Sequence, residues 1–368
     1  MRLNQNSQPE TNSKMPIIKT APTLKDLPAP PLGKTGWPWT EPTEPLPKRM
    51  PDGSEYPRIS IITPSYNQGE FIEETIRSVL LQGYPNLEYI IIDGGSTDNS
   101  VEIIKKYEPW LTYWVSQPDK GQTDAIQQGF NRITGVVWNW LNSDDLLEIG
   151  VLEQIALAYQ AEPLATVYGG EYTIFSDGLL SSVNKKSRCF QNLSELVCVW
   201  ETWSTPQPAI FLSSSACRAV NGLNLSLHYV MDYELYLRLT QLSDFEVKLL
   251  NLTIARARWH PDCKTVKQSI CMANEMMQVF DKFACQHPSL LPKQWQRSRS
   301  RFNYHLALKT AGKEISLKTF LQVSAPFFRH SIWNYRFFWI TLMLYWQPAR
   351  KLRNFQKNII KRYSKLTA

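Results

Sequence analysis

From residue 57 onward, short β-branched runs alternate with longer segments whose apolar residues recur at helical spacing. This alternation limits the chain to few folds. The predicted strands are residues 59–63, 87–92, 112–116 and 136–141, with helical segments between them. Strands that alternate with helices in this way form an open, mostly parallel sheet flanked by helices, so the predicted fold class is α/β. In such sheets ligands bind at the carboxyl ends of the strands.

Polar clusters follow three of these predicted strands. They are TPSYN at 63–67, DGGSTD at 93–98 and NSDD at 142–145. Glycine and short polar residues let a ligand approach the backbone closely and leave side-chain oxygens free to bind it. Asn67 and Glu70 are expected to form a capping box that opens the next helix. Together the clusters predict a site for a nucleotide with a metal ion.

Two adjacent acids, Asp144 and Asp145, follow an apolar strand. A divalent cation, Mg²⁺ or Mn²⁺, that bridges a carboxylate and a diphosphate would relieve their repulsion and neutralise a leaving group. The same NSDD sequence fits a helix N-cap with first-turn acids before residues 146–152. These residues alone leave both interpretations open.

The order and spacing of the motifs resemble family 2 glycosyltransferases, which move a sugar from a nucleotide-sugar to an acceptor. The matching stretches cover about residues 57–260 and are ISIITPSYNQGEFIEETIRSVLLQGYPNLEYIIIDGGSTDNS, DKGQTDAIQQGFNRITG, WLNSDD, YGGEYTIF, QPAIF and HYVMDYELYLRL. The resemblance implies a GT-A (Rossmann-like) fold. The branch that the sequence most resembles consists of bacterial enzymes that act on cell-surface polysaccharides.

The resemblance also implies roles for individual residues. The positions that match the family's nucleotide-binding residues are Thr63, Pro64 and Tyr66 against the nucleoside, Asp93 on the base or ribose, and Asp98 in support of the loop. Asp144 and Asp145 match the metal-binding acidic motif. Asp232 matches the catalytic base.

Three positions depart from the family's pattern. Gly94 stands where a second aspartate is frequent, and Ile126 stands where an arginine is common. The diphosphate is therefore expected to depend more on the metal and on Lys120. Asn142 replaces the first acid of the DxD motif, which leaves open whether Asp144 or Asp145 is the direct metal ligand.

Asp232 lies in MDYELYLRL, about 90 residues beyond the acidic motif. An inverting transfer needs a carboxylate that takes the proton from the incoming hydroxyl, and Asp232 has the position and chemistry for this role. A helix N-cap before ELYLRL is the alternative interpretation. Glu234 is expected on the acceptor side as an orienting or structural acid.

Two further candidates are His260 and Trp203. His260 lies in RARWHPDCK among basic residues, where the family often carries a histidine-containing segment that closes over the donor phosphates. We expect His260 to contact the diphosphate, and a hydrogen-bonded loop histidine is the alternative. Trp203 precedes TPQPAIF, where the family lines its acceptor cleft, so it is the candidate for stacking on a sugar ring. A place in the core is the alternative for Trp203.

Two extensions flank this region. Ten of the 24 prolines lie in the first 50 residues, which predicts an extended leader over residues 1–55. We place the glycosyltransferase domain at 56–262, with a nucleotide-binding half at 56–150 and an acceptor half at 151–262. Residues 263–368 are predicted to form a helical C-terminal region.

The net charge of +7 is concentrated at the C-terminal end. Residues 315–368 hold ten basic and no acidic residues, so residues 1–314 hold 30 basic and 33 acidic ones, a balance of −3. The apolar run at 337–346 is too short to span a bilayer, which needs about 20 residues. The basic amphipathic pattern after it favours an anionic membrane surface, with packing on the body as the alternative. No recognition motif for nucleic acid accompanies these basic residues.

Six cysteines without a CxxC pair, and an N-terminus without an apolar export segment, favour a cytoplasmic setting. The expected function is an inverting glycosyltransferase, peripheral on the inner face of the plasma membrane, that extends a glycan or lipid-linked acceptor in cell-surface polysaccharide synthesis. A non-catalytic nucleotide-sugar scaffold or sensor is the alternative, and the presence of Asp144, Asp145 and Asp232 together argues against it. A nucleotidyltransferase would need a glycine-rich, basic phosphate loop, and TPSYNQG lacks the basic residue.

Overall fold

The computed structural model describes residues 21–176, 187–198 and 205–289. The chain divides into two compact units, residues 1–283 and 284–368, and all the features below belong to the first unit unless stated otherwise. The predicted membrane-binding tail and Trp203 lie outside the described residues. Every helix within the described ranges is too short or too polar to cross a membrane.

The first half of the described chain alternates strands and helices as predicted. Its elements are β1 (Ile59–Ser65), α1 (Ile72–Leu80), β2 (Leu87–Asp93), α2 (Ser100–Tyr107), η1 (Glu108–Trp110), β3 (Tyr113–Ser116), α3 (Gln122–Phe130), β4 (Val137–Trp140), β5 (Leu146–Leu147) and α4 (Val151–Ala161). The second half comprises β6 (Val167–Phe175), β7 (Ser187–Arg188), α5 (Leu193–Val197), η2 (Gln207–Ala209), β8 (Ile210–Ser213), α7 (Ser214–Ala219), α8 (Met231–Leu239), β9 (Val247–Arg258), α9 (Lys264–Lys267) and α10 (Ser269–Gln286), whose last residues enter the second unit.

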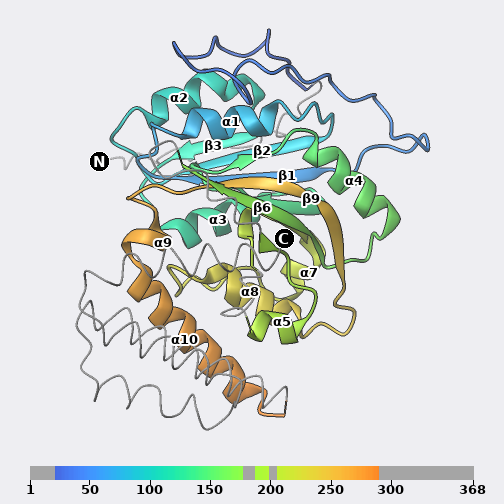
Figure 1. Cartoon of the computed structure of the whole chain (residues 1–368), viewed down its shortest axis with the longest axis vertical. Coiled ribbons are helices and arrows are strands. Elements are labelled where there is room, and N and C mark those ends of the chain that lie inside the picture. The colour runs from blue at the N-terminus through green and yellow to red at the C-terminus, as the bar shows by residue number, and fades with distance from the viewer. Residues whose placement is uncertain (1–20, 177–186, 199–204, 290–368) are drawn as a thin grey trace, which may run out of the picture. The chain divides into compact units, whose positions relative to one another are not determined.

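The described strands form one mixed sheet. Its order is β3-β2-β1-β4-β8-β6-β9-β5, with β7 paired to β6. The strands β3, β2, β1 and β4 are parallel, and antiparallel pairs follow through β8. Helices α1 and α2 cover one face, whereas α3, α7 and α8 lie on the other (Figure 1). The α/β prediction is therefore confirmed.

Continuous apolar strands explain why both faces are covered. Every residue of β1 and β2 is buried, and apolar side chains of α1 and α4 belong to the same buried cluster as these strands. Ile61 and Ile91 from the sheet and Ile76 from α1 are fully buried in this cluster. A strand buried on both faces needs apolar residues at successive positions, which is the pattern that residues 59–63 and 87–92 carry.

The proline-rich leader packs on the domain. Residues 21–55 form no helix or strand, and they run along the face that α1 and α2 cover (Figure 1). The guanidinium of Arg77 in α1 is fully buried and donates to three leader carbonyls, those of Pro28 at 2.8 Å, Pro38 at 3.1 Å and Trp39 at 3.2 Å. Proline removes donors but keeps its carbonyl, so this segment satisfies its backbone through a side chain of the domain.

The predicted capping box is wrong. Helix α1 begins at Ile72 with Phe71 at its N-cap and no side-chain cap. Asn67 instead has a φ of 51°, and its side-chain oxygen accepts a hydrogen bond of 2.8 Å from the backbone N–H of Thr97. Asparagine tolerates this left-handed conformation better than most residues. Asn67 therefore joins the ends of β1 and β2 rather than starting a helix.

Replacing Arg77 with alanine should loosen the leader. The change leaves three carbonyls of the leader, two of them in buried residues, without their donor, so we expect the free energy of unfolding to fall by about 3 kcal/mol. Urea denaturation measures this loss, and limited proteolysis within residues 21–55 reports release of the leader. Arg49→Ala is the control because that side chain is exposed. An Arg77→Ala variant as stable as wild type would show that the leader contributes nothing to the domain.

Candidate functional site

The ends of β1 and β2 are joined directly, as the parallel pairing of neighbouring strands predicts. The backbone N–H of Asn67 donates to Ser96 Oγ at 2.7 Å, and the N–H of Gly69 donates to Asp98 Oδ2 at 2.9 Å. Burial alone would raise the pKa of Asp98, but hydrogen bonds from Ser100 and Gly69 hold it below its ordinary value. Asp98 is thus an ionised acceptor that ties the second cluster to the first.

The predicted nucleoside contacts differ in exposure. The Tyr66 side chain is 61% exposed, whereas Thr63 and Pro64 are buried. The Thr63 hydroxyl lies 3.0 Å from the Tyr89 hydroxyl inside the sheet. Of these three residues, Tyr66 therefore offers the accessible surface at the end of β1.

Asp93 is fully buried at the end of β2. Its carboxylate accepts from the backbone N–H groups of Gly95 at 3.2 Å and Ser96 at 2.9 Å, and from the hydroxyls of Ser96 and Ser116. Four donors match the acceptor capacity of one carboxylate. Asp93 thus fixes the DGGSTD loop.

The NSDD segment is a turn at the end of β4. After it the chain continues into β5, whose Leu146 and Leu147 pair with β9. Helix α4 begins only at Val151, with Gly150 at its N-cap. The helix N-cap alternative for Asp144 and Asp145 is therefore wrong, because pairing with β9 extends the backbone directly after the two acids.

The two acids of this turn have different surroundings. Asp145 is buried, and its oxygens accept from the Arg258 backbone N–H at 3.0 Å and from Asn142 Nδ2 at 3.1 Å. Burial and then the charge of Asp144 raise the pKa of Asp145 well above its ordinary value. Asp144 retains one-fifth of its side-chain surface and places Oδ2 3.1 Å from His260 Nε2. Asp144 is thus the acid that can reach a ligand.

Asp144, His260 and Cys263 form a cluster whose potential ligand atoms lie within 4.8 Å of one another. The His260 ring also packs on Phe71, with ring centroids 4.7 Å apart. The Cys263 sulfur accepts from the His260 backbone N–H and donates to the Arg258 carbonyl, each at 3.2 Å. Burial raises the pKa of Cys263 to about 11, so its thiol stays protonated at neutral pH. Cys263 therefore shapes the turn that carries His260.

Arg258 holds the end of β9 against the acidic turn. Its Nε donates to the Asp144 carbonyl at 3.1 Å, and its Nη2 pairs with Glu74 in α1 at 3.0 Å. The guanidinium lies between two aromatic rings, 4.9 Å from the centroid of Phe71 and 4.4 Å from that of Phe175. Cation–π contacts of this kind strengthen when the cation is shielded from water. Arg258 thus fixes the position of His260 relative to Asp144.

Lys264, one of the basic residues near His260 in the sequence, also reaches the acidic turn. Lys264 Nζ donates to Gln122 Oε1 at 2.8 Å, and Gln122 Nε2 donates to Asn142 Oδ1 at 2.7 Å. Desolvation lowers the pKa of Lys264, an effect opposed by nearby Glu275, Asp119 and Asp144. Lys120 is exposed, and its backbone N–H donates to Asp124. The structure therefore brings Lys264 to the acidic turn through Gln122.

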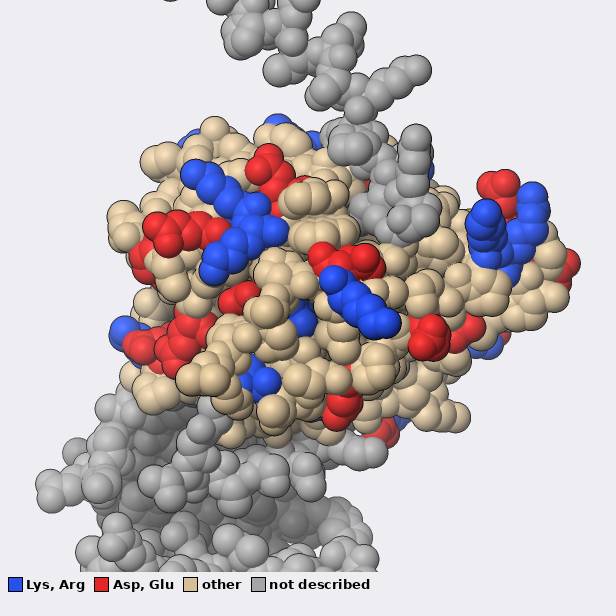
Figure 2. Space-filling model, turned by 90° about the horizontal axis from the view of Figure 1, so that it is seen from above, with Lys and Arg blue, Asp and Glu red and all other residues tan. Residues whose placement is uncertain are grey.

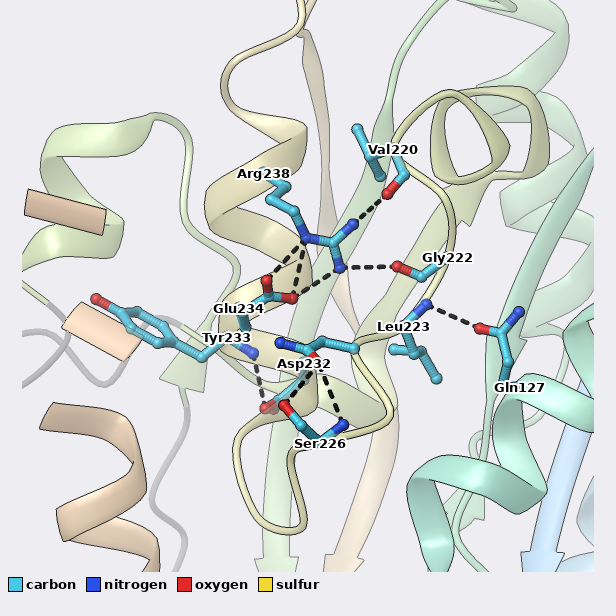
Figure 3. Close-up of polar contacts among 10 residues, drawn as sticks. Gln127, Val220, Gly222, Leu223, Ser226, Asp232, Tyr233, Glu234 and Arg238 are labelled. Carbon is cyan, nitrogen blue, oxygen red and sulfur yellow. Dashed lines mark hydrogen bonds and ion pairs between the residues drawn. The ribbon is translucent and has the colours of Figure 1, made fainter. Parts of the chain in front are cut away.

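Asp232 is the second residue of α8, and Val230 is the N-cap. The N-cap alternative for Asp232 is therefore wrong. Its Oδ1 accepts from the Tyr233 backbone N–H at 2.7 Å (Figure 3). Burial raises the pKa of Asp232 to about 6; hydrogen bonds from the helix backbone oppose this shift and the charge of Glu275 adds to it. Asp232 is thus a half-buried carboxyl group that changes its charge near pH 6.

Glu234 pairs with Arg238 one turn later in α8 (Figure 3). Arg238 Nε lies 2.9 Å from Glu234 Oε1, and Arg238 Nη2 lies 2.7 Å from Oε2. Arg238 also donates to the carbonyls of Val220 and Gly222. Glu234 therefore supports the loop that leads into α8.

Helix α3 connects Asp232 with the acidic turn. Its first residue, Gln122, contacts Asn142, and the Thr123 hydroxyl donates to the Leu227 carbonyl. Farther along α3, Gln127 Oε1 accepts from the Leu223 backbone N–H at 2.8 Å (Figure 3). The loop before Asp232 and the turn that carries Asp144 are thus fastened to the same helix. This arrangement joins residues that lie about 90 positions apart in the sequence.

Residues 60–218 match the family model described as glycosyl transferase family 2. Residues 60–218 therefore form a glycosyltransferase domain of family 2. An uncharacterized glycosyltransferase of Mycobacterium tuberculosis is 29% identical over 187 residues, which are 50% of this chain and 68% of the relative. The chondroitin synthase of Escherichia coli is 27% identical over 52% of this chain and 27% of the synthase. A putative teichuronic acid biosynthesis glycosyltransferase of Bacillus subtilis is 36% identical over 27% of this chain and 40% of the relative.

Two solved structures share the fold of this glycosyltransferase. Staphylococcus aureus TarS 1–349 in complex with UDP-GlcNAc has a TM-score of 0.54 and 14% identity, over 74% of this chain and 81% of that one. The mannosyltransferase PcManGT from Pyrobaculum calidifontis, in complex with GDP-Man and Mn²⁺, has a TM-score of 0.51 and 17% identity, over 81% and 87% of the two chains. The predicted GT-A fold is thereby confirmed.

Proposed function

We propose that this glycosyltransferase moves a sugar, with inversion, from a nucleoside-diphosphate sugar to a glycan or lipid-linked acceptor in cell-surface polysaccharide synthesis. The observation that carries the proposal is the pairing, through α3, of the half-buried Asp232 with a turn that presents Asp144 beside His260. Relatives named for chondroitin and teichuronic acid synthesis support the acceptor class. Neighbours of the same fold that hold UDP-GlcNAc and GDP-Man support the donor class.

Asp232 is assigned the general base. A base works best when its pKa lies near the operating pH, because it is then ionised and still basic enough to take a proton. The pKa of Asp232, about 6, meets this condition at neutral pH, where the carboxylate is ionised. In this assignment an Asp232 oxygen takes the proton from the acceptor hydroxyl as that hydroxyl attacks the anomeric carbon. Retention of such a base argues against a non-catalytic scaffold.

Asp144 and His260 are assigned to hold a divalent cation. A carboxylate oxygen and an imidazole nitrogen 3.1 Å apart fit Mn²⁺, which accepts both ligand types, and water and phosphate oxygens would complete the shell. Mg²⁺ prefers oxygen ligands and would rely on Asp144 and the diphosphate. When bound, the cation would stabilise the charge of the departing diphosphate. Asp145 is assigned to hold the turn, because both of its oxygens already accept hydrogen bonds.

The remaining donor contacts follow from exposure and charge. Tyr66 is assigned to the base because its ring is accessible at the end of β1. Thr63 and Pro64 complete the nucleoside wall, and Asp93 and Asp98 hold the loop beside it. Lys264 joins Lys120 and His260 as a contact for the diphosphate, because its ammonium group lies near Asp144. Trp203 and Glu234 stay assigned to the acceptor side, Glu234 through the loop that Arg238 holds.

We expect Asp232→Asn to abolish transfer without weakening donor binding. Loss of a general base typically costs about 10²–10⁴-fold in rate. Release of nucleoside diphosphate from UDP-GlcNAc and GDP-mannose with Mn²⁺, with and without acceptor extract, measures transfer, and calorimetry measures donor affinity. Because the base must be ionised, the rate of the wild-type enzyme should fall about tenfold per pH unit below pH 6. Asp244→Asn, an exposed acid, is the control. Full activity of Asp232→Asn would refute the mechanism.

Metal binding should separate the two acids of the turn. Asp144→Asn is expected to lose the increase in melting temperature that Mn²⁺ with UDP or GDP produces, and His260→Ala to reduce it. Asp145→Asn should keep most of that increase, because its amide oxygen still accepts from Arg258. Differential scanning fluorimetry measures all three. The assignment is wrong if Asp145→Asn loses the metal effect while Asp144→Asn retains it.

The enzyme is proposed to bind the inner face of the plasma membrane through the basic residues of 315–368. Lysine and arginine are intermixed with aspartate and glutamate over the described surface seen in Figure 2, so this face has no basic patch of its own to bind an anionic surface. Because residues 1–314 have a charge balance of −3, a chain truncated before residue 315 should lose binding to vesicles that contain anionic lipid, as measured by co-sedimentation. Equal binding by the truncated and full chains would refute membrane attachment through this segment.

A further inference from the structure

Glu275, on α10, binds three successive backbone N–H groups at the start of α8. Its Oε1 accepts from His228 at 2.9 Å, and its Oε2 accepts from Tyr229 at 2.6 Å and Val230 at 3.0 Å. Val230 is the N-cap of α8, and Asp232 follows two residues later. A residue of another helix thus fastens the segment that carries the proposed base.

The local sequence leaves a place for this interaction. Valine has no side-chain acceptor, and α8 has no side-chain cap of its own. Successive backbone N–H groups before a helix form a concave anion-binding site, and the positive end of the helix favours negative charge there. Hydrogen bonds to an ionised acceptor are about twice as strong as those between neutral groups. Glu275 on α10 therefore supplies the side-chain acceptor that residues 228–230 lack.

The hydrogen bonds to residues 228–230 also affect the position of Asp232, the proposed base. We propose that Glu275 is a positioning residue that fixes the Asp232 carboxylate by holding residues 228–230 at the start of α8. This inference rests on the proposed function, in which Asp232 takes the proton of the acceptor. It makes α10 part of the active site rather than a distal extension.

The charges around Asp232 give this arrangement a second effect. Burial is the main cause of the raised pKa of Asp232, and the negative charge of Glu275 adds to it. Tyr236, one turn further along α8, also faces Asp232 and stays neutral because burial and Asp232 raise its pKa. Lys264 from α9 lies near Glu275 and carries the opposite charge. Tyr229 also lies beside Glu275, and burial is the main cause of its raised pKa, to which Cys271 and Glu275 add.

The test compares Glu275→Ala and Glu275→Gln with Gln278→Ala, an exposed position of the same helix. In the full chain, Glu275→Ala should lower kcat about 100-fold, the cost of a misplaced catalytic group, with donor KM changed less than about twofold. Glu275→Gln keeps an acceptor oxygen and should recover part of this loss. Because it removes a negative charge, its kcat should begin to fall at a lower pH than that of wild type. Gln278→Ala should match wild type.

Two results would overturn the inference. One is a wild-type kcat in Glu275→Ala, and the other is an acid limb of Glu275→Gln that coincides with that of wild type. If Glu275→Ala fails to fold, the pH profile of Glu275→Gln decides, together with faster amide hydrogen exchange at residues 228–230. Asp232→Asn separates this inference from the proposed function. If Asp232→Asn is active, the base assignment fails; if it is inactive while Glu275 variants behave as wild type, only the role of Glu275 fails.

Discussion

The buried carboxylate of Asp145 joins the acidic turn to the end of β9. It accepts one hydrogen bond from Asn142 within the turn and one from the backbone of Arg258, 113 residues away. A buried carboxylate is costly unless its oxygens are satisfied, so this interaction fixes the turn and the strand end in a single geometry. Asp144 and His260 lie on the two sides of that junction. The 3.1 Å distance between Asp144 Oδ2 and His260 Nε2 therefore depends on Asp145, which is itself buried.

Local patterns predicted most of the first half of the sheet. The runs at 59–63 and 87–92 are buried on both faces, so their apolar residues recur without interruption and mark them as strands. The polar residues after them follow from the rule that parallel strands present their carboxyl ends at one edge. The capping box predicted at Asn67 was wrong because a local spacing does not reveal a distant partner. The spacing of Asn67 to Glu70 fits a capping box, but the partner of Asn67 is Thr97, which is distant in the sequence.

The contacts that the sequence did not predict are long-range hydrogen bonds to backbone groups. Ten prolines lie in the first 50 residues, which indicates an extended chain. Nothing in that composition shows that Arg77 binds three carbonyls of this segment. Glu275 is likewise an ordinary residue of an amphipathic helix until its three N–H partners are known. Side chains that bind backbone leave no complementary residue type in the sequence. Such contacts can therefore be found only in the structure, whereas strands and the polar residues at their ends can be predicted from the sequence.

Asp145 and Asp232 show how one physical cause supports two different roles. Burial raises the pKa of both carboxyl groups. Asp145 accepts hydrogen bonds at both oxygens from two separate segments, which fits a structural acid. Within the described residues, the Asp232 carboxylate accepts hydrogen bonds only from the backbone of its own helix turn. Its position is set indirectly, because the loop before it is hydrogen-bonded to α3 and to α10. A base must keep an oxygen for the proton it takes, so its position has to be set by its neighbours. The support around α8 meets this need without occupying the carboxylate.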